Sequence, residues 1–281
     1  MTEDQVKSLI NSCRLKTCIL DPLPASIMKD CMDVLLPVLT KMINISTETA
    51  NVPVQLKEAM IRPKLRKESL DHKVYSNFRP ISILKFISKM IEKAILYQLT
   101  NYLRGNDLEE SLQSAYKTFH STETALVKVH NDIVSAIDNQ SYIVLLLLDL
   151  SAAFDTVDHK ILLQRLSCRF GINGKSLRWF KSYLENRKQV VNVKGATSCS
   201  KDLRCGVPQG SVLGPILYVL YTSPLGDIVR SHGLSCHFYA DDTQLYCSFK
   251  LHDQAASVQT IESCLNDIDA WMLANMLKLS S

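Results

Sequence analysis

Three aspartates stand where apolar runs stop, and carboxylates in that position can do chemistry. Asp241 and Asp242 are adjacent and follow a run that ends at Tyr239, and Asp149 comes directly after the apolar run 143–148. Turns favour Asp, and an Asp before a helix can cap it, so each aspartate taken singly has an ordinary structural explanation. Their shared position at the ends of apolar runs indicates a common site.

A cluster of three carboxylates is unfavourable unless a cation neutralises it. Two ionised groups about 4 Å apart repel by roughly 4 kcal/mol at an effective dielectric constant near 20. Mg²⁺ binds one or two carboxylates and leaves positions open for phosphate oxygens. Paired metal ions of this kind activate an attacking hydroxyl and stabilise a leaving pyrophosphate. We therefore expect Asp149, Asp241 and Asp242 to bind two Mg²⁺ ions, with Mn²⁺ as an alternative metal.

The elements that must position these aspartates are strands. Four segments have strand composition: 142–148, 189–193, 235–239 and 244–249. The first is apolar on both faces, which predicts a central strand covered on both sides. Only four residues separate the last two, which predicts a tight hairpin with Asp241 and Asp242 at its bend. A hairpin beside a central strand would bring Asp149 to Asp241.

Helical periodicity is clear in four segments, 88–104, 122–138, 175–185 and 256–276. Their apolar stripes are typical of helices that face a core. The longest stripes are Ile91, Ile95, Leu99 and Leu103 in the first segment, Ala125, Val129, Ile133 and Ile137 in the second, and Val258, Ile261, Leu265, Ile268 and Met272 in the last. Ser121 and Thr122 are candidate caps of the second helix. Strands mixed with segregated helices predict the α+β class.

Charge is unevenly distributed along the chain, although the net charge is only +4. Residues 165–204 contain ten Lys or Arg against two acidic residues, and residues 57–67 contain five against one. Such runs are often solvated faces. Two of them flanking acidic sites favour a polyanionic substrate.

Length and composition narrow the class of protein. A chain of 281 residues with 46% hydrophobic content can bury a large core. Its longest purely apolar run has six residues, whereas a membrane span needs roughly 20, so we expect no membrane partner. The nine cysteines are scattered, and the first residues lack the pattern of a signal peptide. These features predict reduced thiols and an intracellular location, cytoplasmic or nuclear.

Four sequence motifs occur in the same order as in a known protein family. The sequence Tyr239-Ala-Asp-Asp242 resembles the metal-binding signature of reverse transcriptases. Residues 77–82, 149–155 and 206–215 are similar to that family's fingers motif, first palm motif, and template and nucleotide loop. Together with residues 113–126, the blocks resemble the polymerase of non-long-terminal-repeat retrotransposons, the long interspersed elements. The likeness runs from about residue 15 to the end of the chain.

The resemblance implies a role for each matching residue. Asp149, Asp241 and Asp242 would form the metal site, and the ring of Phe154 would exclude a ribose 2′-hydroxyl and so favour deoxynucleotides. Nucleotide binding would further involve four residues: Gln209 and Gly210, which match the loop packing against the nascent base pair, Arg79, which matches the arginine that grips the triphosphate, and Lys64 as a second phosphate contact. The bidentate fork of arginine suits that task.

The resemblance also implies a right-hand polymerase with fingers and palm. We expect fingers and an N-terminal extension over residues 1–141, and a palm with an antiparallel sheet over 142–281, with a fingers-like insertion near 165–204. The sequence departs from the family at Lys117-Thr-Phe119, where an arginine and a glycine-containing turn usually contact the template. It also stops before the family's primer grip and thumb, so we expect no thumb.

The function that follows is RNA-directed DNA polymerisation, in which deoxynucleotides are added to the 3′-hydroxyl of a DNA primer on an RNA template. Two alternatives remain open. An inactive retrotransposon remnant would bind nucleic acid through residues 165–204 without extending a primer. A two-metal nuclease would use the same carboxylates but would give no reason for Phe154 and Gln209. Both the polymerase and the remnant predict salt-sensitive binding, because phosphate contacts release counterions.

Overall fold

The predicted helices and strands are present in the computed structural model, which describes residues 1–12, 19–149 and 154–279. The chain divides into two units, each made of two segments. The first unit comprises residues 1–106 and 162–214, and the second comprises residues 107–161 and 215–281. The predicted division into fingers and palm at residue 141 differs from these bounds, and the assignment of fingers and palm stays a prediction.

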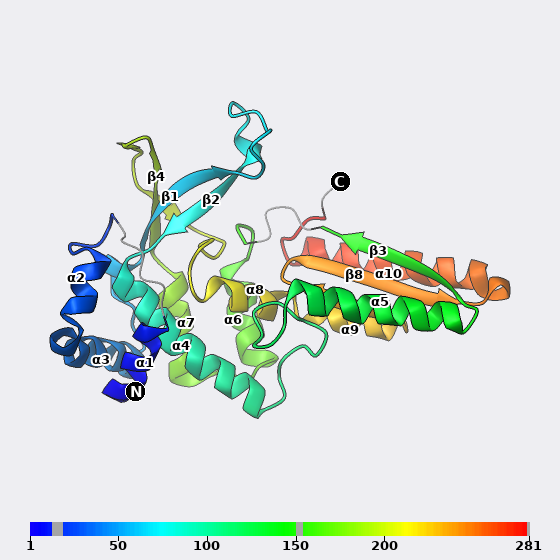
Figure 1. Ribbon diagram of the computed structural model, residues 1–281, viewed down its shortest axis with the longest axis horizontal. Coiled ribbons are helices and arrows are strands. Elements are labelled where there is room, and N and C mark those ends of the chain that lie inside the picture. Colours follow the sequence, from blue (N-terminus) through cyan, green and yellow to red (C-terminus); the bar gives the residue numbers. More distant parts are fainter. Residues whose placement is uncertain (13–18, 150–153, 280–281) are drawn as a thin grey trace. The chain divides into compact units, whose positions relative to one another are not determined.

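The first unit combines helices with a mixed five-stranded sheet (Figure 1). Its helices are α1 (Glu3–Asn11), α2 (Ala25–Asp30), α3 (Met32–Thr49), α4 (Phe86–Gly105) and α7 (Gly174–Leu184), with short 3₁₀ turns at Val54–Leu56 and Tyr75–Asn77. Its strands are β1 (Glu58–Leu65), β2 (Phe78–Ile83), β4 (Arg187–Val193), β5 (Ala196–Thr197) and β6 (Lys201–Leu203). Two further helices, α6 (His159–Cys168) and α8 (Gly214–Thr222), cross points where the chain passes between units.

Strand pairing in the first unit is built around β1. This strand pairs antiparallel with β2 and parallel with β4, and β4 carries β5 and β6 on antiparallel ladders. The α4 stripe of Ile91, Ile95, Leu99 and Leu103 is buried, as its periodicity predicts. Each such fully buried side chain contributes roughly 1.5–3 kcal/mol of transfer free energy, so the stripe anchors α4 in the core of this unit.

The second unit contains the hairpin predicted to carry Asp241 and Asp242. Its elements are α5 (Thr122–Asp138), β3 (Tyr142–Leu148), α9 (Pro224–Ser231), β7 (Ser235–Tyr239), β8 (Asp242–Phe249), a 3₁₀ turn (Leu251–Asp253) and α10 (Gln254–Ala274). The strands form an antiparallel sheet in the order β3-β8-β7. Ser121 caps α5, because its hydroxyl accepts from the Thr124 amide while the Thr124 hydroxyl accepts from the Ser121 amide.

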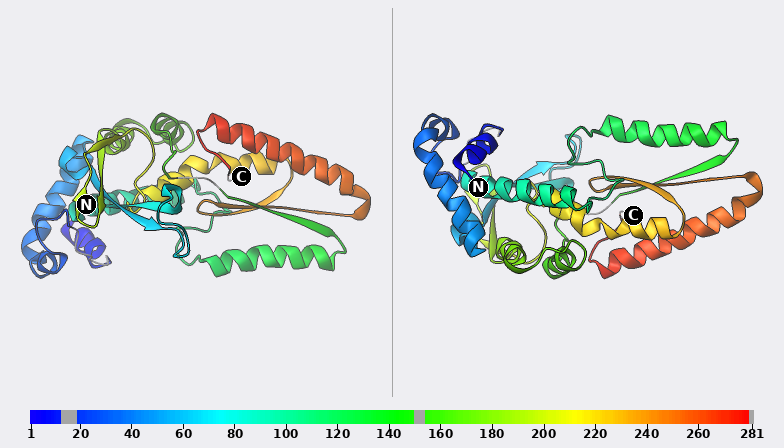
Figure 2. Two further views of the ribbon diagram at one scale, coloured as in Figure 1. Left: turned by 90° about the horizontal axis from the view of Figure 1, so that it is seen from above. Right: turned by 90° about the horizontal axis from the view of Figure 1, so that it is seen from below.

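Helices cover the two faces of this sheet. Both views of Figure 2 place α5 on one side of the strands and α9 and α10 on the other. The core on the α9 and α10 side includes Leu225, Val229, Leu245, Ile268 and Met272, all nearly inaccessible to solvent. The mixture of segregated helices and antiparallel strands confirms the predicted α+β class.

The prediction of a central strand at 142–148 is wrong within the described residues, because β3 lies at the edge of its sheet. Leu145 and Leu147 are 41% and 71% exposed. Leu145 pairs with Tyr246, whose hydroxyl bonds Asp132 of α5, so both leucines lie on the α5 face of the sheet. Helix α5 therefore covers this face only in part.

Two predicted helical stripes are shorter in the structure than the sequence indicates. Ile137 is 58% exposed at the end of α5, where Ala136 is buried instead. Val258 is 41% exposed near the start of α10, whose buried stripe is Ile261, Cys264, Ile268 and Met272. Among the described residues, no helix has the length and apolar character needed to span a membrane.

Candidate active site

Strand register brings the three aspartates to one end of the second unit's sheet. Leu148, the last residue of β3, pairs with Thr243, so Asp149 follows β3 beside the start of β8. Tyr239 pairs with Asp242, which leaves Ala240 and Asp241 as a two-residue turn. The predicted hairpin is confirmed, and its bend lies at the sheet end where β3 stops.

The carboxylates influence one another electrostatically. The pKa of Asp242 is raised by partial burial and by the negative charges of Asp241 and Asp149. Asp149 and Asp242 are exposed and Asp241 is half-buried, so solvent screens this repulsion without removing it. The three aspartates therefore share one local field.

The chemistry of these side chains fits a divalent cation. Carboxylate oxygens are ligands that Mg²⁺ prefers, and the repulsion that raises the pKa of Asp242 is the effect a bound cation would remove. Within residues 1–12, 19–149 and 154–279, however, no three His, Cys, Asp or Glu side chains are grouped closely enough to hold a metal ion. The three carboxylates therefore lie at one end of the sheet, but they do not surround a single point as the ligands of a bound metal ion would.

Gln113 holds the backbone of the turn between β7 and β8. Ala240 has a left-handed φ of 57°, which is unfavourable for a residue with a Cβ atom. The side-chain Oε1 of Gln113 accepts from the Ala240 amide at 3.1 Å, and the side-chain Nε2 of Gln113 donates to the Ala240 carbonyl at 3.5 Å. Gln113 is 4% exposed, and its own segment pairs with Phe238 of β7. This buried amide offsets the strain of the aspartate turn.

Tyr218 connects Phe154 to the aspartates. The Phe154 ring stacks on the Tyr218 ring at 4.9 Å between centroids and 26° between planes. Burial raises the pKa of Tyr218, and so do the negative charges of Asp241, Asp149 and Asp242. The Tyr218 hydroxyl is buried without a hydrogen-bond partner among the described residues. The structure thus places the predicted sugar-contacting ring against a tyrosine that lies in the field of all three carboxylates.

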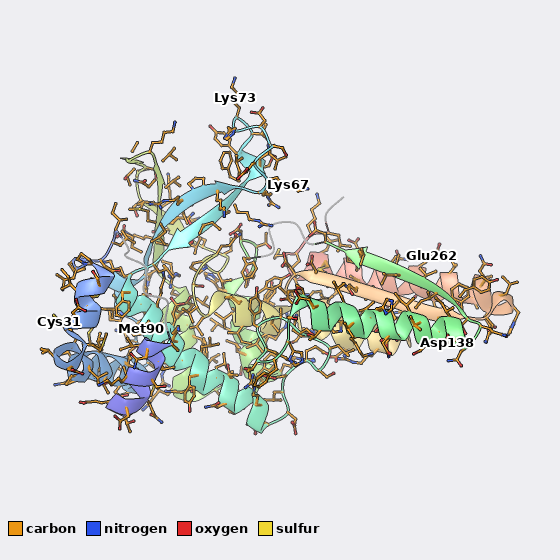
Figure 3. The ribbon with its side chains drawn as sticks, viewed as in Figure 1. Cys31, Lys67, Lys73, Met90, Asp138 and Glu262 are labelled. Carbon is orange, nitrogen blue, oxygen red and sulfur yellow. The ribbon has the colours of Figure 1, made fainter. Side chains whose placement is uncertain are left out.

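The predicted phosphate-binding residues lie together in the first unit. Lys64 of β1 and Arg79 of β2 are direct partners in the antiparallel register. Directly opposed residues point to the same face of a sheet, and both side chains are exposed. Further basic side chains, including Lys67 and Lys73, lie on the loop that joins the two strands (Figure 3).

The loop carrying Gln209 and Gly210 packs against the end of β2. The Ser82 amide donates to the Gln209 carbonyl at 2.7 Å. Gly210 has a φ of 107°, and a Cβ atom there would lie 2.7 Å from the Ser82 carbonyl oxygen. Only glycine fits this close approach without moving the backbone. The loop and β2, which carries Arg79, are therefore joined through Ser82.

The predicted site residues thus fall into two groups, each gathered within its own unit. Asp149, Phe154, Asp241 and Asp242 belong to the second unit, and Lys64, Arg79, Gln209 and Gly210 belong to the first. Residues 150–153 of the aspartate block lie outside the described residues. Sequence reasoning assigned no role to Gln113 or Tyr218. Gln113 opens a block with family resemblance, but Tyr218 stands in an apolar helix that gives no signal of a site.

The chain is similar in sequence to known proteins. The profile of the family described as reverse transcriptase (RNA-dependent DNA polymerase) matches residues 65–281. The chain is 31% identical over 209 residues to a probable RNA-directed DNA polymerase from transposon BS of Drosophila melanogaster, covering 73% of this chain and 23% of that protein. It is 34% identical over 187 residues to a probable RNA-directed DNA polymerase from transposon X-element of the same species, covering 66% and 20%.

Solved structures support the fold alone. An apo telomerase from Candida tropicalis matches with a TM-score of 0.55 at 13% identity, covering 80% of this chain and 43% of that one. A form of that telomerase truncated from its C-terminal domain gives 0.53 at 16% identity, covering 91% and 54%. These likenesses extend over both units of the chain.

The relatives confirm the predicted resemblance to retrotransposon polymerases, although the chain spans only about a fifth to a quarter of their length. With more than three quarters of its residues matched by the family profile, the chain belongs to the reverse transcriptase (RNA-dependent DNA polymerase) family.

Proposed function

We propose that this chain carries out RNA-directed DNA polymerisation, adding deoxynucleotides to the 3′-hydroxyl of a DNA primer by a two-metal mechanism. The observation that carries the proposal is the strand register that gathers Asp149, Asp241 and Asp242 at one sheet end. Paired divalent ions held there would activate the primer hydroxyl and neutralise the leaving pyrophosphate. The family match supports this chemistry over nuclease activity.

The chain's own residues would select and orient the nucleotide. Phe154, held by its stack on Tyr218, would exclude a ribose 2′-hydroxyl from the sugar site. Lys64 and Arg79 present two cations on one sheet face, where they would bind triphosphate oxygens. Gln209 and Gly210 would pack against the nascent base pair, on a loop fixed to Ser82 by a backbone hydrogen bond.

The direct test is extension of a DNA primer annealed to an RNA template by the purified chain with Mg²⁺, repeated with Mn²⁺. Asp242→Asn should lower extension by a factor of about 10³ or more, because a ligand carboxylate is lost. Asp138→Asn is the matched control, because Asp138 is exposed at the end of α5 (Figure 3). Absence of extension by the unsubstituted chain with either metal would overturn the proposal.

A second candidate function is binding of nucleic acid without catalysis. It is favoured by the absence of a closed ligand cage in the described residues, together with the exposed cations of β1 and β2. Both functions predict binding that weakens with salt, because cations that contact phosphates release counterions. Only the polymerase predicts primer extension that depends on Asp242, so the same experiment separates the two.

A further inference from the structure

Glu92 is a buried acid whose chemistry the proposed reaction does not use. It lies on α4 beside the apolar stripe and is 1% exposed. Glutamate is almost never fully buried unless it is paired, because burial of a charge is unfavourable without compensating contacts. Its hydrogen bonds therefore indicate what it does.

Glu92 binds the backbone of the loop that carries Gln209 and Gly210. Its Oε2 atom accepts from the Val212 amide at 2.7 Å and from the Leu213 amide at 3.1 Å. These two residues directly precede α8, where amide groups have no partner within the helix. A carboxylate 120 residues away in the chain thus supplies the acceptor that a local capping residue usually provides.

Neutral hydrogen bonds also hold this loop. The Ser211 hydroxyl donates to the Pro208 carbonyl at 2.8 Å and accepts from the Gly214 amide at 2.9 Å. The Gln209 carbonyl accepts from Ser82. Glu92 adds a carboxylate to these contacts, and hydrogen bonds to a charged group contribute more than neutral ones.

Arg187 supplies a buried positive charge near Glu92. It is 1% exposed, donates to the Tyr183 carbonyl at 3.1 Å, and places its guanidinium 4.8 Å from the centre of the Tyr183 ring. Burial raises the pKa of Glu92, and Arg187 and the two loop amides oppose that rise. The guanidinium atoms Nε and Nη2 have no hydrogen-bond partner among the described residues, so Arg187 acts on Glu92 through its field.

We infer that Glu92 is a positioning residue that fixes the conformation of the nucleotide loop 206–214, with Arg187 as its buried counter-charge. The inference rests on the proposed polymerase function for its kinetic consequence. Glu92 acts through the loop backbone, and its conformational consequence can be measured without catalysis.

Two double variants separate positioning from general stability. Glu92→Gln with Arg187→Met removes both buried charges but keeps a side-chain oxygen that can accept from Val212 and Leu213. Glu92→Met with Arg187→Met removes the charges and the acceptor at nearly the same side-chain volume. Replacing a buried charge pair by neutral groups is often neutral for stability, whereas removing one partner is strongly destabilising. The exposed Glu48→Gln serves as the control for the chemical change.

Amide hydrogen exchange on a peptide covering 206–215 is the first measurement. The Glu92→Met, Arg187→Met double variant (Met/Met) should lose protection at Val212 and Leu213 by a factor of about ten or more relative to the Glu92→Gln, Arg187→Met double variant (Gln/Met). Glu48→Gln should keep this protection. The second measurement is steady-state deoxynucleotide incorporation. The Met/Met variant should raise KM for the nucleotide about tenfold with a smaller change in kcat, and the Gln/Met variant should stay within about threefold of the unsubstituted chain.

Each result decides one claim. Equal loop protection in the two double variants would overturn the positioning role. Altered protection with unchanged KM would overturn its kinetic consequence. Absence of incorporation by the unsubstituted chain would overturn the proposed function and leave the exchange result as the test of positioning. If a double variant fails to fold, Glu92→Asp takes its place, because the shorter acid keeps the charge but withdraws the acceptor from both amides.

Discussion

Lys64 and Arg79 are direct cross-strand partners, so two exposed cations stand side by side on one face of the β1–β2 pair. Like charges directly opposite each other destabilise a sheet by a few tenths of a kcal/mol. This repulsion is unfavourable in the free chain, and a bound anion would relieve it. A polyphosphate bound between the two side chains would turn this repulsion into binding.

Substitution of Lys64 should move stability and nucleotide binding in opposite directions. Lys64→Gln removes the repulsion and should raise the thermal unfolding midpoint by about 1–2 °C. It should also raise KM for deoxynucleotides about three- to tenfold, and Arg79→Gln should raise it further because a bidentate contact is lost. Calorimetry and steady-state kinetics check both. A variant that binds nucleotide as well as the unsubstituted chain would contradict the assignment of Lys64.

Substitution of Asp242 by Asn should lower activity and raise stability. Its raised pKa means that the folded chain holds this proton more tightly than the unfolded chain, so stability falls as pH rises upward from about 4. Asp242→Asn removes that repulsion and should raise the unfolding midpoint at pH 7 by about 2 °C in EDTA, with a flatter pH dependence. An unchanged midpoint and pH profile would show that the three carboxylates do not repel one another appreciably.

The hydrogen bonds between the Gln113 side chain and the Ala240 backbone should contribute measurably to stability. Gln113→Met leaves the half-buried Ala240 amide without its acceptor and should lower the free energy of unfolding by about 0.5–1.5 kcal/mol. Ala240→Gly relieves the left-handed backbone and should raise it by about 0.5–1 kcal/mol. Urea unfolding of both variants tests this. A destabilising Ala240→Gly would mean that the turn is not strained.

Phe154 should govern discrimination against ribonucleotides. Phe154→Val shortens the side chain that stacks on Tyr218 and should increase ribonucleotide relative to deoxynucleotide incorporation about 10- to 100-fold. Phe249→Val is the matched control, because Phe249 also stacks on a tyrosine, Tyr142, at the opposite end of the sheet. Primer extension with each nucleotide type gives the ratio, and an equal ratio in both variants would count against a sugar-contacting role.

His237 should make the second unit sensitive to acid. Burial lowers its pKa, helped by Lys128, His120 and Lys117 and opposed by Asp132. The unfolded chain therefore takes up the proton first, and stability is lost as pH falls below about 6.5.

The same substitution at two histidines isolates this effect. His237→Gln should reduce the fall of the unfolding midpoint between pH 7.5 and 5.5 by at least about 2 °C. His252→Gln should leave the fall unchanged, because His252 is 79% exposed in the turn before α10. Identical pH profiles for all three chains would contradict the assignment.

The sequence predicted those parts of the fold that depend on local pattern. The stripe of α4 is regular because the helix packs against neighbours along its length, and the aspartate hairpin follows from two short strands with a polar turn. The edge position of β3 could not be predicted in this way, because an apolar run reports side-chain hydrophobicity and not the order of strands in a sheet.

The same limit applies to the site. The aspartates could be found because they interrupt apolar runs. Gln113 could not, because its contact with Ala240 spans 127 residues, and Tyr218 is indistinguishable in sequence from the apolar helix around it. The role of Glu92 could not be predicted either, because the two amides that it binds lie 120 and 121 residues away in the chain.

Because β3 has a free outer side within the described chain, its backbone is a template for another extended segment. The strand reads Tyr-Ile-Val-Leu-Leu-Leu-Leu, without charge, proline or glycine, which is the composition that favours cross-β association. Expressed alone, the polypeptide should self-associate as its concentration rises. A lysine in place of the exposed Leu147 would improve its solubility while leaving the ladder to β8 intact.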